Sequence, residues 1–412
     1  DTVVQREASR EPERAGEVVE GILGLRLLLS AGSILLSWAL MFLVDPSPRL
    51  VGLIVLVSFS FLFSLHSLLL IPYIVGLKMG LPKLLLGIWA VVLSAIKLGM
   101  IAAGAPLEVF VGLEVVSGAG NFIVSWLLAR RAGFRIRLRF RGAPWGRFFA
   151  EAWPIALAQT LIQVYLRVDH LMLYRMVGAA EVGLYGASTR LVEFANVIPV
   201  VFMGSVFPIL SRLHLESQEK LDEATALSFR GMAWFGFPLA VFLALFAQPV
   251  LLFLFGDEFG GAAPILAFLA WSLPASFLNS ILYNRLFSSR DQRTAAGVAL
   301  LAAGTNILLN LLLIPRYQGQ GAAAATLVSY GFVVFLSLGP RSSRGVAAQA
   351  IKGSLRPALG AGVALLVVRA AGVGWVSGLV LVPLVFGLGM VVLREWGREE
   401  LRLLGRVTGG ER

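Results

Sequence analysis

Charged and amide side chains occur deep inside apolar runs of this chain, and residues of these types could do chemistry there. Residues 151–212 hold two such runs, joined by a tight turn that contains glycine. In the first run the polar residues recur at spacings of four, four, three and four, which places them on one face of a helix. They are Gln159, Gln163, Arg167, His170 and Tyr174, with Asp169 on roughly the opposite side.

The second run repeats the pattern with Tyr185, Thr189, Glu193 and Asn196, and Arg190 lies three residues before Glu193. A charge at the centre of a bilayer costs at least about 2.5–3.5 kcal/mol, so such side chains normally face a bundle interior or a watery cavity. Two interpretations follow. Paired charges could join helices to one another, or the charges could line a cavity or an ion pathway.

The elements that must position these residues are membrane-spanning helices. Of the 412 residues, 58% are hydrophobic and only 14% are charged, whereas soluble domains are about 25% charged. An apolar helix of about 20 residues crosses a bilayer core of about 30 Å. About twelve spans are predicted, at residues 22–44, 51–75, 84–103, 107–128, 153–177, 182–210, 229–255, 262–286, 294–314, 321–338, 357–371 and 376–393.

Lysine and arginine are distributed unevenly between alternate connections. One side holds 27 of the 35 basic residues, whereas the other holds only Arg49, Arg175 and Arg316. By the positive-inside rule the first side, which includes both chain ends, is cytoplasmic. The net charge of +11 is therefore mostly topological, and no nucleic-acid partner is expected. We expect a multi-pass protein of a bacterial or archaeal cytoplasmic (inner) membrane, in contact with membrane lipids.

An internal repeat organises the spans, because the hairpins at 83–128 and 294–338 have similar lengths and similar small-residue outer turns. The predicted fold is all-α and polytopic, with two pseudo-repeated helical lobes around a central cavity and a C-terminal helix pair. The predicted parts are a cytoplasmic lead-in at 1–20, a first lobe at 21–129, a basic cytoplasmic linker at 130–147, a second lobe at 148–340, and the helix pair with a basic tail at 341–412. The first lobe has four helices against six in the second, so two helices are expected to be missing ahead of it.

Two blocks of sequence resemble a known family. The first contains Arg167 and Asp169 as R-x-D, the turn 182–185 followed by Ala187 and Arg190, and residues 207–211; the second is residues 310–329, with Leu-x-Pro and Gly-x-Gly-Ala-Ala. These blocks resemble the Wzx-type polysaccharide flippases, members of a superfamily that also holds MATE drug exporters and lipid II flippases. The resemblance implies export of a polyprenyl-diphosphate-linked oligosaccharide for cell-surface polysaccharide, such as lipopolysaccharide, by alternating access. It also implies a polysaccharide polymerase and glycosyltransferases of the same pathway as partners.

Roles for the deep polar residues follow from that implied cargo. A bidentate guanidinium suits a diphosphate, so Arg167 is expected to bind it, with help from Arg190, Lys97, Gln159 and Gln163. Ion coupling is expected from Asp169, Glu193 and Glu114. Glu193 lies one helical turn from Arg190, which suggests that these two form a pair, and Asp169 is placed to bond a neighbouring helix.

Other function classes find less support. The outer connections are too short to carry the acid and base of a membrane glycosyltransferase or ligase, so no enzyme is expected. No cysteine is present, the three histidines lack metal-ligand spacing, and no P-loop occurs, so no metal or cofactor is expected. A MATE-like drug or cation antiporter and a lipid II flippase remain alternatives, although three deep bases against three deep acids do not make the acidic cavity that a cation exporter needs. Proline kinks are predicted at Pro72, Pro199, Pro208, Pro238, Pro249 and Pro274.

Overall fold

The computed structural model describes residues 15–44, 47–76, 78–133, 145–288 and 292–393, together with residues 4, 7 and 8. Its regular structure over these residues is entirely helical, as predicted. The chain divides into two compact units, Asp1–Leu161 and Ile162–Arg412, and the division falls inside helix α8 (Trp145–Met176). Most of the predicted linker 130–147 lies outside the described residues, and the predicted lobe boundaries stay predictions.

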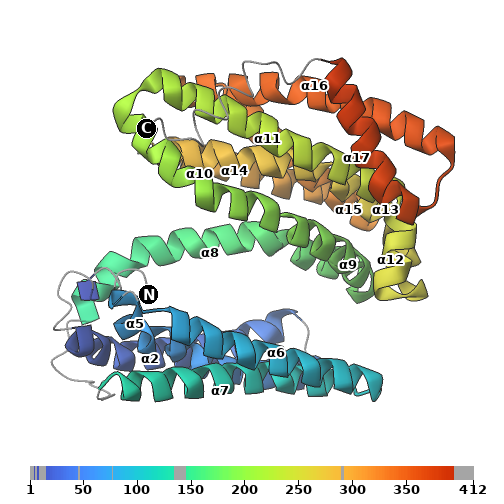
Figure 1. Cartoon of the computed structure of the whole chain (residues 1–412). Helices are drawn as coiled ribbons and strands as arrows, with labels where there is room; N and C mark the ends of the chain where they lie inside the picture. The colour runs from blue at the N-terminus through green and yellow to red at the C-terminus, as the bar shows by residue number, and fades with distance from the viewer. Residues whose placement is uncertain are drawn as a thin grey trace. The chain divides into compact units, whose positions relative to one another are not determined.

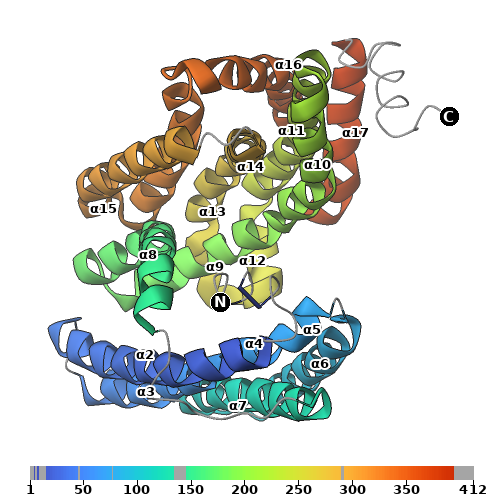
Figure 2. The same ribbon diagram turned by 90° about the vertical axis from the view of Figure 1, so that its left-hand side faces the viewer.

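Unit 1 is a small group of helices that pack side by side (Figures 1 and 2). Its buried residues come mainly from the first helix and from a broken span, and include Leu23, Leu68 and Ile71. The indole of Trp145 donates to the carbonyl of Gly21 at 2.7 Å, which fixes the start of α8 within this unit. The helices are α2 (Ala15–Val44), α3 (Pro48–Ser58), η2 (Phe59–Leu65), α4 (His66–Leu69), α5 (Ile71–Val75), α6 (Gly80–Ala102) and α7 (Leu107–Arg131).

Unit 2 holds the larger apolar core. Helix α11 (Gln218–Leu245) packs along α14 (Ser272–Ser288) and α16 (Arg341–Ala371), and α17 (Trp375–Val392) packs along α16 (Figure 1). Phe229, Phe277 and Phe386 are fully buried where these helices meet. The other helices are α9 (Ala179–Ala195), α10 (Val197–Glu216), α12 (Ala247–Phe255), η3 (Asp257–Ala262), α13 (Ala263–Ala270) and α15 (Gln292–Leu336).

Several predicted spans are broken near proline, as the sequence indicated. New helices begin one or two residues before Pro72, Pro199, Pro249 and Pro274, at the starts of α5, α10, α12 and α14. Proline is tolerated in the first turn of a helix because its missing N–H would have no partner there. Pro208 and Pro238, by contrast, lie inside the continuous helices α10 and α11.

Helix α15 is interrupted at Gln318, whose backbone angles of φ 51° and ψ −130° are not helical. We call residues 292–317 the first half of α15 and residues 319–336 its second half. The halves fold back on each other, because Val298 and Ala302 pack in one cluster with Val333. The predicted pair of spans at 294–314 and 321–338 is therefore confirmed as a hairpin.

The penultimate span is longer than the prediction of 357–371. Helix α16 begins at Arg341, and Pro357 lies inside it. The prediction places the basic residues before Pro357 in a connection. Arg, Lys and Gln are good helix formers, however, and these residues form the first part of α16. The span ends at Gly372, whose left-handed φ of 59° closes it.

Among the described residues, nine helices are long and apolar enough to cross a membrane, or ten if the bent pair Asp257–Ala270 and Ser272–Leu286 forms one span. Many large apolar side chains on these helices are exposed, including Val91, Phe194, Leu300 and Val392, each at least 70%. A protein surrounded by water rarely exposes such extensive apolar surface. The chain is a multi-pass membrane protein. The helix Gly297–Leu336 is counted once although it contains two predicted spans. This accounts for part of the difference between the number of helices found and the twelve predicted spans.

Candidate functional site

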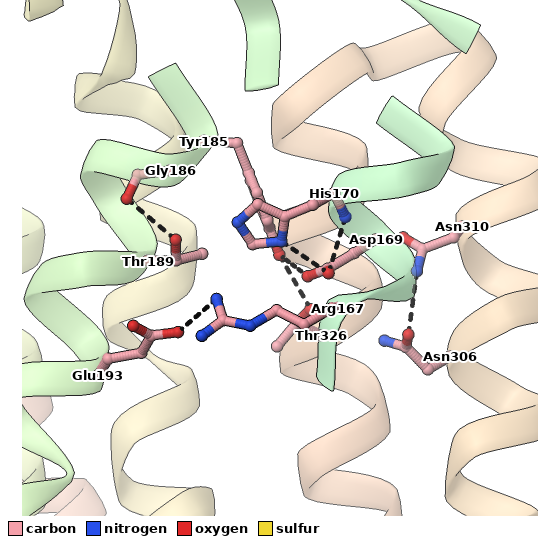
Figure 3. Close-up of polar contacts among 10 residues, drawn as sticks. All are labelled: Arg167, Asp169, His170, Tyr185, Gly186, Thr189, Glu193, Asn306, Asn310 and Thr326. Atoms are coloured by element: carbon pink, nitrogen blue, oxygen red, sulfur yellow. Dashed lines mark hydrogen bonds and ion pairs between the residues drawn. The ribbon is translucent and has the colours of Figure 1, made fainter. Parts of the chain in front are cut away.

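A buried carboxylate lies at the centre of the polar contacts in unit 2. The side chain of Asp169 near the end of α8 accepts a hydrogen bond from the hydroxyl of Tyr185 on α9, with 2.5 Å between Oδ2 and the hydroxyl oxygen. Tyr185 is fully buried and Asp169 is 8% exposed. Figure 3 shows the two side chains pointing toward each other from their two helices. The prediction that Asp169 bonds a neighbouring helix is confirmed.

His170 completes the surroundings of this carboxylate. Its backbone N–H donates to Asp169 Oδ1 at 2.8 Å, and its ring Nδ1 lies 3.0 Å from the same oxygen (Figure 3). The imidazole also packs edge-on against the ring of Tyr185, with 5.0 Å between the ring centroids. Since an isolated buried carboxylate is costly, these contacts are what allow Asp169 to lie in an apolar bundle.

The second half of α15 reaches the same cluster. The Tyr185 hydroxyl lies 3.4 Å from Thr326 Oγ1. We call Asp169, His170, Tyr185 and Thr326 the Asp169 cluster. Sequence reasoning placed Tyr185 in a polar stripe but missed Thr326, which directly follows the alanines 322–325 and has little periodic signal.

Two buried asparagines lie one turn apart on the first half of α15. The Nδ2 of Asn310 donates to Asn306 Oδ1 at 3.0 Å (Figure 3). Asn310 Oδ1 is buried and has no hydrogen-bond partner within the described part of the chain. The amide oxygens of Asn279 and Gln349 share this property, so it does not single out the Asn306 and Asn310 pair as a binding site.

Arg167 faces away from the buried carboxylate, as expected from its position two residues earlier. Its guanidinium contacts the carboxylate of Glu193 on α9, with 2.9 Å between Nη1 and Oε1 (Figure 3). The sequence suggested that Glu193 pairs with Arg190 on the same helix, and this was wrong. The carboxylate of Glu193 instead contacts a guanidinium that comes from the other helix. Arg190 is exposed and forms no ion pair within the residues that the structure describes.

The remaining predicted site residues fall elsewhere. Lys97 on α6 and Glu114 on α7 form an ion pair with 2.6 Å between Nζ and Oε1, and both belong to unit 1. Gln159 and Gln163 lie on α8, but their side chains are outside the described residues. The structure thus brings together Arg167, Asp169 and Glu193 in one part of unit 2, while Lys97 and Glu114 pair with each other in unit 1.

The described residues contain no group of three or more His, Cys, Asp and Glu side chains that could hold a metal ion. Unit 2 does present the buried, hydrogen-bonded carboxylate of Asp169. Two arginines lie on the same two helices: Arg167 on α8, which is ion-paired, and Arg190 on α9, which has no ion pair among the described residues. A buried carboxylate can exchange a proton or a small cation, and a guanidinium can bind a phosphate through two parallel hydrogen bonds.

A family model, a curated relative and a solved structure that resemble this chain all have the same description. The sequence model of a family described as lipid II flippase MurJ matches residues 51–387. The probable lipid II flippase MurJ of Haemophilus influenzae is 29% identical over 197 residues, which cover 43% of this chain and 38% of that protein. An uncharacterized membrane protein of Methanocaldococcus jannaschii is 29% identical over 99 residues, which cover 24% of this chain and 19% of that protein. The matched stretches thus span less than two-fifths of these two relatives.

A solved structure, lipid II flippase MurJ in an inward closed conformation, has the same fold. Its TM-score is 0.75, at 14% sequence identity, and the similarity covers 94% of this chain and 87% of that chain. At this identity the likeness concerns the fold alone. It supports the predicted all-α, polytopic class.

Proposed function

The chain belongs to the lipid II flippase MurJ family, and from that premise we propose that it moves a polyprenyl-diphosphate-linked saccharide across a membrane. Membership in a flippase family agrees with the predicted transporter class and not with an enzyme. The resemblance to Wzx-type flippases identified the correct superfamily. Within that superfamily, the family match favours the alternative, a lipid II flippase. We therefore propose lipid II, the peptidoglycan precursor, as the cargo, in place of an oligosaccharide for surface polysaccharide.

The family match over residues 51–387 carries this proposal, and the chemistry of unit 2 supports it. A diphosphate-linked cargo needs cationic groups inside an otherwise apolar bundle. Arg167 and Arg190 are exposed on α8 and α9, and the guanidinium of Arg167 forms an ion pair whose carboxylate a phosphate could replace. We propose that Arg167 binds the cargo's phosphates with Arg190 in support, and that Lys97, Gln159 and Gln163 contribute as the sequence suggested.

Transport against a gradient needs a group that responds to a driving ion. We propose Asp169 for this role, because it is a buried carboxylate whose partners, Tyr185 and His170, can rearrange when its charge is neutralised. Glu193 is proposed as the second such group, since cargo binding at Arg167 would release its carboxylate. Glu114, which is paired with Lys97, keeps the ion-coupling role only as a hypothesis from the sequence.

Reconstitution into lipid vesicles tests the cargo. Fluorescent lipid II is placed in both leaflets, and a reagent that cannot cross the membrane reports the fraction that becomes accessible with time. We expect faster exposure of lipid II with the protein than in protein-free vesicles. A polyprenyl diphosphate carrying an oligosaccharide without peptide serves as the competing cargo. Movement of this cargo but not of lipid II would restore the Wzx-type interpretation, and with it a polymerase and glycosyltransferases as pathway partners.

A further inference from the structure

Two polar contacts between described residues link helix α9 to the second half of α15, and one of them belongs to the Asp169 cluster. That one is the contact of Tyr185 with Thr326. The other lies nearer the start of both helices, where Glu181 Oε1 accepts a hydrogen bond from the backbone N–H of Gly319 at 2.8 Å. Glu181 has no role in the function proposed above.

The two contacts lie on matching faces of the two helices. Glu181 precedes Tyr185 by four residues, one helical turn, and Gly319 precedes Thr326 by seven, about two turns. A hydrogen bond at the start of the second half therefore constrains both its rotation and its sliding along α9. The position of Thr326 against Tyr185 follows from this constraint.

The backbone that Glu181 holds is unusual. Gln318 has φ 51°, and among the described residues it is the non-glycine residue with positive φ. A conformation of this kind costs about 1–3 kcal/mol and persists only where surrounding contacts impose it. Because Gln318 connects the two halves of α15, the contact of Glu181 with Gly319 is well placed to impose it.

The α15 hairpin is tightly packed at Gly319 and borders a cavity nearby. A Cβ on Gly319 would lie 2.6 Å from Glu181 Oε1 and 2.6 Å from Ile265 Cδ1, so a larger residue here would have to displace these two side-chain ends. On the same hairpin, a cavity of about 170 Å³ is lined by Phe268, Leu313, Tyr317, Gln320, Gly321 and Ala324. The packing around the hairpin is therefore tight at Gly319 and looser on the side of this cavity.

We propose that Glu181 is a positioning residue that sets the register between α9 and the second half of α15, and through it the contact of Tyr185 with Thr326 beside Asp169. The effect of this register on transport rests on the proposed function. The register itself rests only on the geometry of unit 2. Glu181 acts through its hydrogen bond to Gly319 and does not touch the cargo or the ion.

Amide hydrogen exchange on the purified protein tests the structural part without any transport. Glu181→Ala should speed exchange at Gly319 and over residues 320–326 by about tenfold, because their anchoring hydrogen bond is gone. Glu181→Gln keeps a side-chain oxygen that can accept from Gly319 and should restore slow exchange. If Glu181→Ala lowers the yield of folded protein, Glu181→Asp, whose shorter side chain withdraws the carboxylate, should give the same direction of change.

Glu258→Ala is the matched control. Glu258 lies in the first turn of η3, which packs against α9 through Gly261 and Leu184, and it is exposed without a hydrogen bond or ion pair in the described part of the chain. This variant should leave exchange at residues 319–326 unchanged. Unchanged exchange in Glu181→Ala, or an equal increase in Glu258→Ala, would overturn the proposal.

Transport in vesicles tests whether the register matters to the Asp169 cluster. Tyr185→Phe removes the hydroxyl that contacts Asp169 and Thr326, so adding Glu181→Ala to it should slow transport no further. Two fully additive losses would show that Glu181 acts by another route and would overturn the positioning role. If the unmodified protein flips no cargo at all, the proposed function fails, while the exchange experiment still decides the register.

Discussion

The guanidinium of Arg167 lies 2.9 Å from the carboxylate of Glu193, and both side chains remain about half exposed, at 58% and 50%. Two residues further along α8, Asp169 is buried and hydrogen-bonded to Tyr185. The R-x-D motif therefore separates two kinds of group. Its arginine belongs to a half-exposed ion pair, and its aspartate belongs to a buried hydrogen-bond network.

Arg167→Ala should abolish flipping without lowering the amount of protein in the membrane, because the phosphates lose their bidentate partner. Arg167→Lys should keep part of the activity, since the charge survives although the fork of two donors is lost. Both are measured by lipid II exposure in vesicles with matched protein amounts. Normal transport by Arg167→Ala, or a loss explained by disappearance of the protein, would mean that the residue only joins α8 to α9.

Glu193→Gln tests whether the pair of Arg167 and Glu193 serves to bind cargo or only to join α8 to α9. If Arg167 binds phosphate, removing the competing carboxylate should leave cargo affinity equal or higher. Affinity is measured by the quenching of a fluorescent polyprenyl diphosphate on titration. A fall in protein abundance for both Glu193→Gln and Arg167→Ala would favour a purely structural pair.

Tyr185→Phe should destabilise the protein by about 1–3 kcal/mol, because Oδ2 of the buried Asp169 carboxylate loses the hydroxyl that donates to it. The measurement is the midpoint of thermal unfolding in detergent. Tyr283→Phe is the control, since Tyr283 is partly buried and its hydroxyl makes no hydrogen bond within the described residues. Equal midpoints for the two variants would argue that the Tyr185 hydroxyl is not holding Asp169.

The sequence was sufficient for the helical class and for most spans, because apolar runs of membrane length have few alternative structures. It also located Asp169 correctly, since a carboxylate inside such a run must find a partner. It could not identify that partner. Whether Glu193 turns to Arg190 on its own helix or to Arg167 on α8 depends on how α8 and α9 face each other, which helical periodicity alone does not determine.

Thr326 and the Glu181 contact were missed for a related reason. Thr326 follows four alanines, and a single small polar residue in a transmembrane helix is unremarkable in sequence. Glu181 lies at the start of α9, where an acidic residue is explained by the helix dipole alone. Only the fold-back of α15 at Gln318 brings Gly319 to this carboxylate, and no local pattern predicts the backbone angles of Gln318.

Membrane topology remains a prediction from the distribution of basic residues. Positions 139 and 344 should be cytoplasmic, and positions 45, 257 and 318 should be outside. Positions 45 and 139 are not among the residues that the structure describes. Because the chain contains no cysteine, single cysteines can be introduced and labelled with a reagent that cannot cross the membrane. Labelling after permeabilisation provides the control. Labelling of position 139 or 344 from outside would reverse the orientation.

Gly120→Ala should destabilise unit 1, because a Cβ at this position would lie 2.1 Å from the indole of Trp89. The indole would have to move away from the carbonyl of Ser117, to which it donates at 3.2 Å. A displacement of this kind in a packed interface costs about 1–3 kcal/mol. Gly87→Ala on α6 is the control, since a Cβ there meets nothing within 4 Å, and it should be neutral or stabilising. Thermal unfolding in detergent compares the two.

Gln318→Gly should stabilise unit 2, because glycine adopts positive φ without the penalty that glutamine has at φ 51°. Release of about 1–3 kcal/mol of strain is partly offset by the larger entropy that glycine has in the unfolded chain, about 0.5–1 kcal/mol. Gln320→Gly is the matched control, since Gln320 is an exposed residue of the second half of α15 and glycine in a helix is destabilising. The midpoint of thermal unfolding should therefore rise for position 318 and fall for position 320. Equal midpoints would show that the backbone at Gln318 is not strained, and would remove the reason for Glu181 to hold it.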